Sequence, residues 1–412
     1  MSDSLPPASF PPTLDAAHAR IAAVRPGEYA RTRNRLDGAV TRLSPYLTHG
    51  FVSLPEALRR IAEKHRLDVQ HKLVYEFGWR EFFHHGWRHL GDGILSSLHE
   101  GPLPEAAYRR ELPADLREAR TGVPAIDEAV RTLYREGWLH NHARMWLASY
   151  AVHLRKLHWR VGADWMFAHL LDGDLASNHL SWQWVAGTGS HKPYLFNAEN
   201  VAKYAPTGWH SGGSAIDRSY EALDRIARDG RADVGGNADA GSGTPEPALW
   251  RTPPPDLAVP IALAPPEPAS LRGRDVWLVH PWALGEPPAD LPKGTLRIGV
   301  FFSDFHAAWP WSERRWRFVA ARMGPFCERV CFTDAASLSA LLAGARSVRA
   351  QAEPHLGALL AGYELQPRPR LFADPARRCA SFSQFWRKVT ADVPSVAALL
   401  CTPQQAGLFE SP

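Results

Sequence analysis

The sequence predicts a multidomain protein in which an all-α domain is followed by a smaller α/β domain with a parallel sheet. Apolar residues recur at helical spacing across residues 13–206, where strand-like alternation is scarce. A stretch rich in Gly and Pro follows, and beyond it short apolar runs of strand length alternate with helical segments. We therefore expect a helical domain at residues 1–210, a linker at 211–270 and an α/β domain at 271–412.

The predicted helices of the first domain have recognisable ends. Ser53 directly precedes Leu54, Pro55 and Glu56, and Ser followed closely by Pro is typical of a helix start. We place helix ends at Gly137 and Gly162, because Gly readily adopts the backbone conformation that stops a helix. The expected helices, with a short one inside the linker, are Leu54–Lys64, Val69–Leu90, Ala125–Glu136, His140–Leu157, Ala163–Leu171 and Ser219–Arg228.

Strands and helices alternate in the last third of the chain. This order favours a parallel sheet with helical crossovers. The region has neither a dinucleotide-binding G-x-G-x-x-G nor a P-loop, so its sequence indicates no ligand. The expected strands are Asp275–His280, Leu296–Phe302, Val330–Phe332 and Ser347–Ala350, and the expected helices are Glu313–Met323, Ala335–Leu342 and His355–Gly362.

The composition is that of a globular protein. Of 412 residues, 45% are apolar and 22% are charged, which excludes wholesale disorder and a disulfide-stabilised miniprotein. There is no apolar run of about 18 residues and no N-terminal signal segment, so we expect a cytoplasmic protein. The net charge of +4 permits nucleic-acid binding without demanding it. The cysteines lack zinc-site spacing, and we expect reduced thiols rather than an iron–sulfur cluster at Cys327, Cys331, Cys379 and Cys401.

Two polar clusters have helical spacing. Glu76, Trp79 and Arg80 share one face of a predicted helix with many aromatic residues, where they form either the polar floor of a pocket or a surface ion pair. Asn141 and Arg144 repeat this spacing on a basic helix, which is either a solvated face or a phosphate-binding one.

A turn between two predicted helices carries the sequence Leu-Asp-Gly-Asp-Leu around Gly173. Its flanking leucines predict burial, and buried carboxylates need partners, for which Arg144 is the natural candidate. Asp172 is alternatively a helix N-cap. Two carboxylates are too few for a typical carboxylate metal site, so we expect no metal. Thr41 to Ser44 offer hydroxyls and a guanidinium just before a helix. These groups either bind a pyrophosphate or form a capped turn.

Five stretches of the chain, in order, resemble the FAD-binding domain of the DNA photolyase/cryptochrome family. The match covers Val24 to Pro206, a little under half of the chain, and its last two stretches are highly specific. The resemblance implies an all-helical domain that holds a U-shaped FAD in a deep cavity. The stretches are GEYARTRN (Gly27–Asn34), TRLSPYLTHG (Thr41–Gly50), YEFGWREFF (Tyr75–Phe83), TGVPAIDEAVRTLYREGWLHNHARM (Thr121–Met145) and LLDGDLASNHLSWQW (Leu170–Trp184).

The resemblance also implies which residues hold the cofactor. Arg144 and Asp172 would pair beside the flavin ring. Asn178 would face flavin N5, where an amide tunes the redox chemistry without being an acid. The implied FAD-binding residues are Tyr29, Thr41, Arg42, Leu43, Ser44, Arg144, Asp172, Gly173, Asp174 and Asn178.

In the repair enzymes of this family, the pyrimidine dimer of UV-damaged DNA is flipped out against the flavin. Light excites reduced FAD, one electron passes to the dimer, the dimer splits and the electron returns. Glu76 and Asn141 would bond the pyrimidine edges, and with Met145 and Asn178 they are the implied catalytic residues. Enzymes for (6-4) lesions carry His in place of Asn141 and Met145, so this pocket resembles the cyclobutane-dimer type. The implied DNA or lesion contacts are Arg33, Glu76, Trp79, Arg80, Asn141, His142, Trp184 and Lys192.

The family passes electrons from the surface to oxidised FAD along a chain of tryptophans. Trp182 and Trp159 match its first two members. The third is missing at Ala106, and Tyr108 is the nearby substitute.

Three departures from the family pattern stand out. The chain starts at the flavin domain, without the usual N-terminal α/β antenna domain. The loop after Trp184 is short and lacks a common DNA-contacting Arg, and His142 replaces another. These changes favour weaker DNA binding or a shift toward single strands. The alternative function is that of a cryptochrome-like blue-light photoreceptor without repair activity. The sequence identifies neither an antenna chromophore nor an oligomeric state.

Overall fold

The computed structural model describes residues 9–231, 243–255, 257, 261 and 270–401. Several parts of the predicted linker, among them residues 232–242 and 262–269, lie outside these ranges. Within them, no helix combines the length and the apolar character that a bilayer crossing requires.

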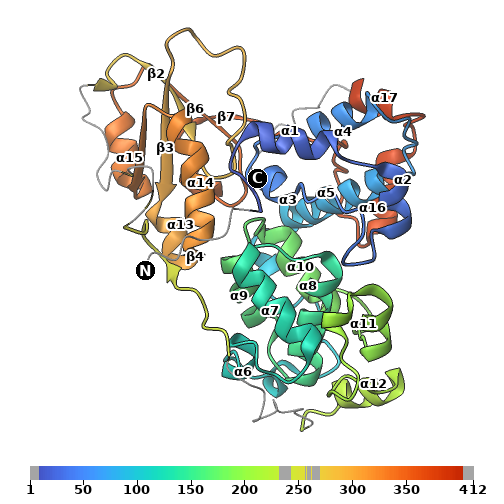
Figure 1. Cartoon of the computed structure of the whole chain (residues 1–412). Helices are drawn as coiled ribbons and strands as arrows, with labels where there is room; N and C mark the ends of the chain where they lie inside the picture. The colour runs from blue at the N-terminus through green and yellow to red at the C-terminus, as the bar shows by residue number, and fades with distance from the viewer. Residues whose placement is uncertain (1–8, 232–242, 256, 258–260, 262–269, 402–412) are drawn as a thin grey trace.

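The first half of the chain is a body of packed helices (Figure 1). Ser53 caps its fourth helix through a bond from the Glu56 backbone N–H to its hydroxyl, and Gly137 ends another with φ of 65°. The helices are α1 (Leu14–Ala22), α2 (Pro26–Thr32), α3 (Ser44–Thr48), α4 (Leu54–Ala62), α5 (Lys72–Leu90), η1 (Gly91–Leu95), η2 (Glu105–Ala107), α6 (Ala114–Arg117), α7 (Pro124–Glu136), α8 (Asn141–Ser149), η3 (Tyr150–Leu154), α9 (Trp159–His169), α10 (Leu175–Ala186), α11 (Ala198–Tyr204), η4 (Thr207–Trp209) and α12 (Tyr220–Arg228).

Two expectations for this half are wrong in detail. The segment His140–Leu157 is not one helix, because α8 passes into the π-turn η3 and then stops. Gly162 does not end a helix but lies inside α9. A Cβ atom there would come within 2.4 Å of the Trp182 ring, so Gly is required by packing and not by helix termination.

The second half contains the predicted parallel sheet, which is confirmed. The strand order is β5-β3-β2-β6-β7, and every pairing is parallel. β2 is central and buried along its whole length. The strands are β2 (Asp275–Val279), β3 (Leu296–Phe302), β5 (Arg329–Thr333), β6 (Ser347–Gln351) and β7 (Glu364–Gln366).

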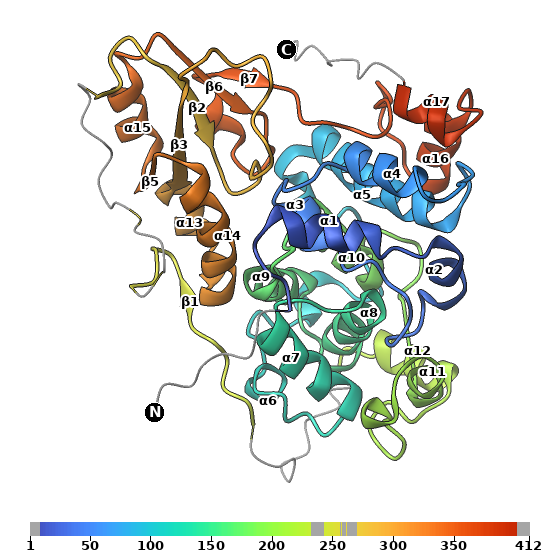
Figure 2. The same cartoon turned by 45° about the horizontal axis from the view of Figure 1, so that its top comes forward.

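Helices cover this sheet (Figure 2). They are α13 (Ser303–Ala308), α14 (Glu313–Phe326) and α15 (Ala335–Leu342). The expected helix His355–Gly362 is wrong, because only the short 3₁₀ turn η6 (Gly357–Leu360) forms there. A two-residue strand β1 (Leu249–Trp250) pairs antiparallel with β4 (Trp311–Ser312). The cysteines whose side chains are described, Cys327, Cys331 and Cys379, are free thiols.

The carboxyl ends of the strands meet the helical body near α3 and α10. One nitrogen of the buried His49 ring lies 2.5 Å from the Pro281 carbonyl oxygen, beyond β2. The Leu175 backbone N–H donates to His355 Nε2 at 3.1 Å, beyond β6. One apolar core runs continuously from α1, α4 and α5 into the sheet. The sheet half therefore supports the helical half directly.

The end of the described chain returns to the helical body. The helices α16 (Phe382–Thr390) and α17 (Val396–Cys401) lie against α5 and α4 (Figures 1 and 2). The predicted short helix in the linker is confirmed as α12, whose Leu223 is buried in the helical core. The division into three regions stays a prediction.

Candidate functional site

A deep pocket opens in the helical body between α2, α3, α5, α8 and α10. Its empty volume, with the space open to solvent included, is about 1460 Å³. Predicted site residues far apart in sequence meet in its wall: Tyr29, Arg33, Thr41, Arg42, Leu43, Ser44, Glu76, Trp79, Arg80, Asn141, His142, Arg144, Met145, Asp172, Asn178 and Trp182.

An ion pair lies in the wall of this pocket. Arg144 Nη2 donates to both carboxylate oxygens of Asp172, at 3.0 and 2.7 Å. Arg144 Nε also donates to the Leu139 carbonyl at 3.0 Å, which fixes the guanidinium plane. The Asp172 side chain is nearly fully buried and its partner is partly buried. The predicted Arg144–Asp172 pair is thus present, and it presents a fixed, charge-compensated edge to the pocket.

The turn that carries Asp172 is held from the sheet half. Arg315, at the start of α14, is fully buried and donates to the backbone carbonyls of Gly173 at 2.7 Å and Phe167 at 3.2 Å. The alternative that Asp172 is a helix N-cap is wrong. Asp174 caps α10 by accepting from the Ser177 backbone N–H at 2.7 Å.

Asp174 lies behind the pocket wall in a buried charged cluster. Asp174 Oδ2 lies 3.0 Å from His84 Nε2 and 3.9 Å from His355 Nε2. Burial by itself would raise the pKa of Asp174, but His84 and Arg80 hold that pKa well below its usual range. Asp174 is therefore an ionised anchor for α10, which carries Asn178 and Trp182.

Replacing Gly173 by Ala is expected to destabilise the protein by about 1–3 kcal/mol, the usual cost of overpacking. A Cβ atom at this position would lie 2.5 Å from Arg315 Nη1 and 2.7 Å from the Phe167 carbonyl oxygen. Chemical unfolding measures the loss. Gly357→Ala is the matched control, because nothing lies within 4 Å of a Cβ there. Equal stability of the two variants would contradict the close packing of the turn.

Residues before α3 form a second wall. Arg42 has a left-handed backbone with φ of 51°, and its guanidinium lies over Trp138 and bonds Glu136 at 2.7 Å. The Ser44 hydroxyl accepts from the Trp138 indole N–H at 3.1 Å. These contacts order the segment so that polar groups of Thr41 to Ser44 line the cavity.

The opposite wall comes from α5 and α8. Glu76 pairs with Arg33, which directly follows α2, at 2.9 Å and not with Arg80 of its own helix. Burial raises the pKa of Glu76, while Arg33 opposes that rise. On α8, the Asn141 amide lies 3.4 Å from the Met145 sulfur. A carboxylate, an amide and a thioether therefore share this wall.

An aromatic stack supports Trp79. The Phe382 ring of α16 lies parallel to Trp79, with ring centroids 4.0 Å apart. The sequence prediction missed α16, although its buried Phe382, Phe385, Trp386 and Val389 follow helical spacing. It also missed Arg315, because no local pattern links that residue to the distant turn.

Few free cations face the mouth of the pocket. Arg80 is turned inward, where it donates to the Thr48 hydroxyl at 3.0 Å. Burial lowers the pKa of His142 to about 4, so its ring is neutral at pH 7. Arg33 is compensated by Glu76. The roles of these residues as DNA contacts stay predictions, and His142 brings no charge to them.

Asn178 and Trp182 lie one helical turn apart on α10. The Asn178 amide donates to the Ala163 carbonyl at 2.8 Å, which fixes its plane and leaves its oxygen and second N–H for other partners. The Trp182 ring lies against α9 at Gly162. Both side chains are almost completely buried and line the pocket.

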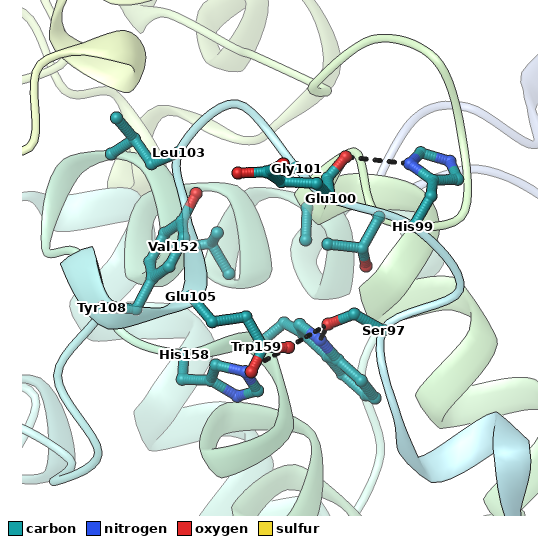
Figure 3. A pocket seen from close by; sticks show the side chains of 12 residues that line it. Ser97, His99, Glu100, Gly101, Leu103, Glu105, Tyr108, Val152, His158 and Trp159 are labelled. Atoms are coloured by element: carbon teal, nitrogen blue, oxygen red, sulfur yellow. Dashed lines mark hydrogen bonds and ion pairs between the residues drawn. The ribbon is translucent and has the colours of Figure 1, made fainter.

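The remaining predicted residues lie outside the wall of the pocket. Trp159 and Tyr108 line a separate, smaller cavity (Figure 3). Trp184 is 41% exposed and packs on Tyr194, with ring centroids 5.7 Å apart. The full set is Tyr108, Trp159, Gly173, Asp174, Trp184 and Lys192.

The residues present fit a flavin nucleotide. The Ser177 hydroxyl and His142 Nδ1 belong to lining residues, are buried and have no hydrogen-bond partner among the described residues. Such polar atoms call for a ligand partner. The pocket also combines a hydroxyl-rich wall, suited to phosphates, with aromatic and amide groups suited to a planar ring.

One group of side chains elsewhere brings metal-ligand types together. Ligand atoms of His85, His89 and Asp374 all lie within 4.8 Å of one another. Asp374 is already paired with the guanidinium of Arg88, and His85 Nε2 accepts from the Cys379 backbone N–H at 2.9 Å. Because protein partners satisfy these groups, we assign no metal to them.

Comparisons with known proteins found relatives that are similar to part of this chain. A deoxyribodipyrimidine photo-lyase of Streptomyces griseus is 39% identical over 152 residues, which cover 37% of this chain and 33% of the relative. One from Escherichia coli is 33% identical over 198 residues, or 45% of this chain and 41% of the relative. The chain thus spans about a third to two fifths of the length of these relatives. A solved cryptochrome of Synechocystis is 26% identical, with a TM-score of 0.41, over 48% of this chain and 46% of that one.

The family comparison covers α5, α8 and α10 of the pocket but not α2 and α3. A model described as the FAD binding domain of DNA photolyase matches residues 73–209, which extend from the start of α5 to η4. This range holds the Arg144–Asp172 pair, Asn178 and Trp182. Residues 73–209 of this chain are therefore similar to the FAD-binding domain of the DNA photolyase family.

Proposed function

We propose that the protein is a FAD-dependent repair enzyme that uses light to split cyclobutane pyrimidine dimers in DNA. The observation that carries the proposal is the make-up of the pocket. Its lining includes the Arg144–Asp172 pair and also Glu76, Asn141 and Met145. One cavity therefore offers both a cofactor side and a side that suits a pyrimidine edge.

On the cofactor side, the residues that would hold FAD divide by chemistry. Hydroxyl and backbone groups of Thr41 to Ser44 would bind the phosphates. Arg144 and Asp172 would border the flavin ring, and Asn178 would place an amide against it. When bound in its reduced form, FAD supplies the light-driven electron that opens the dimer and takes it back afterwards.

On the lesion side, Glu76 would accept the imide N–H of a flipped pyrimidine. Its pairing with Arg33 leaves the two groups neutral overall, so that an uncharged base can bind beside them. Asn141 would bond a carbonyl of the base, and Met145 and Trp79 would provide apolar contact. Glu76, Met145 and Trp79 are partly buried and Asn141 is exposed, so a bound base would itself have to exclude water from these groups.

We include an electron path in the proposal. Trp182 lies in the pocket wall, and Trp159 begins the adjacent helix α9. Trp159 and Gly162 are three residues apart on α9, and Gly162 faces the Trp182 ring, so the two indoles lie along one side of this helix. An electron that passes along this path would reduce the oxidised cofactor, and this reduction would activate the enzyme.

One observation favours a cryptochrome-like photoreceptor as the second candidate. Of the predicted basic DNA contacts, His142 is neutral, Arg33 is paired and Arg80 points inward, which leaves the exposed Lys192. Dimer loss and the light response of the flavin, measured in one illumination experiment, separate the candidates. Purified protein with bound FAD is first reduced and illuminated with an oligonucleotide that carries one dimer. Loss of the dimer in light but not in darkness supports repair, and an intact dimer beside a responding flavin supports the photoreceptor.

Binding to dimer-containing duplex is expected to be lesion-selective and only weakly salt-dependent. Each neutralised phosphate contributes about −0.9 to the slope of log K against log salt, so one to three cations give a slope of about −1 to −3. Filter binding at several salt concentrations measures the slope. Equal affinity for damaged and intact duplex would count against the repair proposal.

A further inference from the structure

The second indole of the electron path has a proton acceptor built beside it, and the first does not. The Trp159 indole N–H donates to the Ser97 hydroxyl at 3.0 Å. The Ser97 hydroxyl in turn donates to Glu105 Oε1 at 2.7 Å (Figure 3). The Trp182 indole nitrogen is buried and has no hydrogen-bond partner among the described residues. The two tryptophans therefore differ in whether their N–H proton can leave.

We propose that Ser97 and Glu105 form a proton exit for Trp159, which traps the charge separated by light. The inference rests on the electron path of the proposed function. Photoexcited, oxidised flavin is the oxidant: Trp182 gives it one electron, and Trp159 then gives one electron to Trp182. An indole that has lost an electron is a much stronger acid than indole. Its N–H proton passes to Ser97 Oγ while the Ser97 proton passes to Glu105.

The step balances within the protein. The N–H bond of Trp159 breaks and an O–H bond of Glu105 forms, while Ser97 ends with one proton as it began. The products are a neutral Trp159 radical and a neutral Glu105 carboxyl group. Trp182 regains its electron and keeps its own proton throughout. Return of the electron to Trp159 would then also require return of a proton, and this requirement slows recombination.

The surroundings keep Glu105 ready to accept the proton. The hydrogen bond from Ser97 lowers the pKa of Glu105, so it is a carboxylate at pH 7. His158 Nδ1 accepts from the Arg160 backbone N–H, which leaves the proton of the neutral ring on Nε2. That atom lies 3.5 Å from Glu105 Oε1. The Glu105 side chain is 53% exposed, so the proton can continue to solvent.

The geometry also separates this role from that of Tyr108. The Tyr108 ring meets the His158 ring edge-on, with centroids 6.4 Å apart, and lines the same cavity of about 290 Å³. A tyrosine at the end of the path would give up an electron to Trp159. A proton exit needs no further electron donor. Loss of Tyr108 and loss of Ser97 therefore have different consequences.

The test is transient absorption of FAD-loaded protein after a light flash, with Ser97→Ala and Glu105→Gln as variants. A positioned proton acceptor typically speeds a step 10²–10⁴-fold, so deprotonation of the Trp159 radical should slow by about 100-fold in Ser97→Ala. The yield of reduced flavin should fall in parallel. Ser96→Ala and Glu100→Gln are the matched controls, one exposed next to Ser97 and one in the same cavity wall. Both controls should behave like wild type.

A flavin-free measurement completes the test. In ¹⁵N-labelled apoprotein, loss of the Ser97 acceptor should shift the Trp159 indole N–H resonance upfield, with little change at Trp182. Unchanged radical lifetimes in Ser97→Ala, with a tyrosyl radical that Tyr108→Phe removes, would overturn the proton exit. If Trp182→Phe leaves photoreduction intact, the electron path itself fails, and absence of bound FAD would mean that the proposed function fails.

Discussion

Replacing Trp182 by Phe is expected to suppress photoreduction of oxidised flavin while leaving repair by pre-reduced enzyme largely intact. A benzene ring is much harder to oxidise than an indole, and a barrier rise of about 3 kcal/mol already slows a step about 100-fold. The electron path through Trp182 is needed only to reduce the cofactor before repair begins. Repair itself passes one electron from the flavin to the lesion and back. Absorbance during illumination follows photoreduction, and the dimer assay follows repair.

The control for this variant is flavin content. Trp182 lines the pocket and its ring packs on Gly162, so Phe should keep the apolar contact. Photoreduction at the wild-type rate, with FAD still bound, would show that Trp182 is a packing residue only. Lost repair in pre-reduced enzyme would instead place Trp182 in the binding of FAD or lesion.

Replacing Glu76 by Ala is expected to reduce repair far more than flavin retention. Removing a charge-assisted hydrogen bond typically costs roughly 1.5–3 kcal/mol, which corresponds to about one to two decades in affinity or rate. The removal also leaves Arg33 without its partner at the pocket wall. FAD is held by other residues and should remain. Repair yield per absorbed photon and flavin occupancy are measured together.

Glu63→Ala is the matched control, because Glu63 is exposed directly after α4 and lies outside the pocket wall. Full repair by Glu76→Ala would reduce Glu76 to the ion-pair partner of Arg33. Loss of FAD from this variant would assign α5 to the cofactor and not to the lesion.

The sequence predicted those features of the site that depend on complementary residue types. Arg144 and Asp172 meet as expected, because a buried carboxylate needs a cation and few were available. The alternative of an N-cap at Asp172 was two residues too early, because Asp174 caps α10. Both acids suit that role, and only the three-dimensional path of the turn distinguishes them.

Long-range packing explains what the sequence prediction missed. Gly162 was predicted to end a helix. Instead, its lack of a side chain leaves room for the ring of Trp182 from another helix. Arg315 belongs to the sheet half and still holds the Gly173 carbonyl at 2.7 Å. Phe382, near the end of the chain, stacks on Trp79. Each of these contacts joins segments whose relation no local periodicity encodes.

The support from the second half has a consequence for the site. Arg315 and His355 hold the turn and the start of α10, which carry Asp172, Asn178 and Trp182. The parallel sheet therefore positions pocket residues although none of its strands lines the pocket. This arrangement makes the helical site dependent on both halves of the described chain.

The most direct test of the central proposal is the number of dimers repaired per bound flavin. Protein with reduced FAD is mixed with excess oligonucleotide that carries a single cyclobutane dimer and is illuminated without oxygen, beside a dark control. The proposed function predicts several repaired dimers per flavin in light, none in darkness, and no net oxidation of the flavin. Fully flavin-loaded, light-responsive protein that leaves every dimer intact would contradict it.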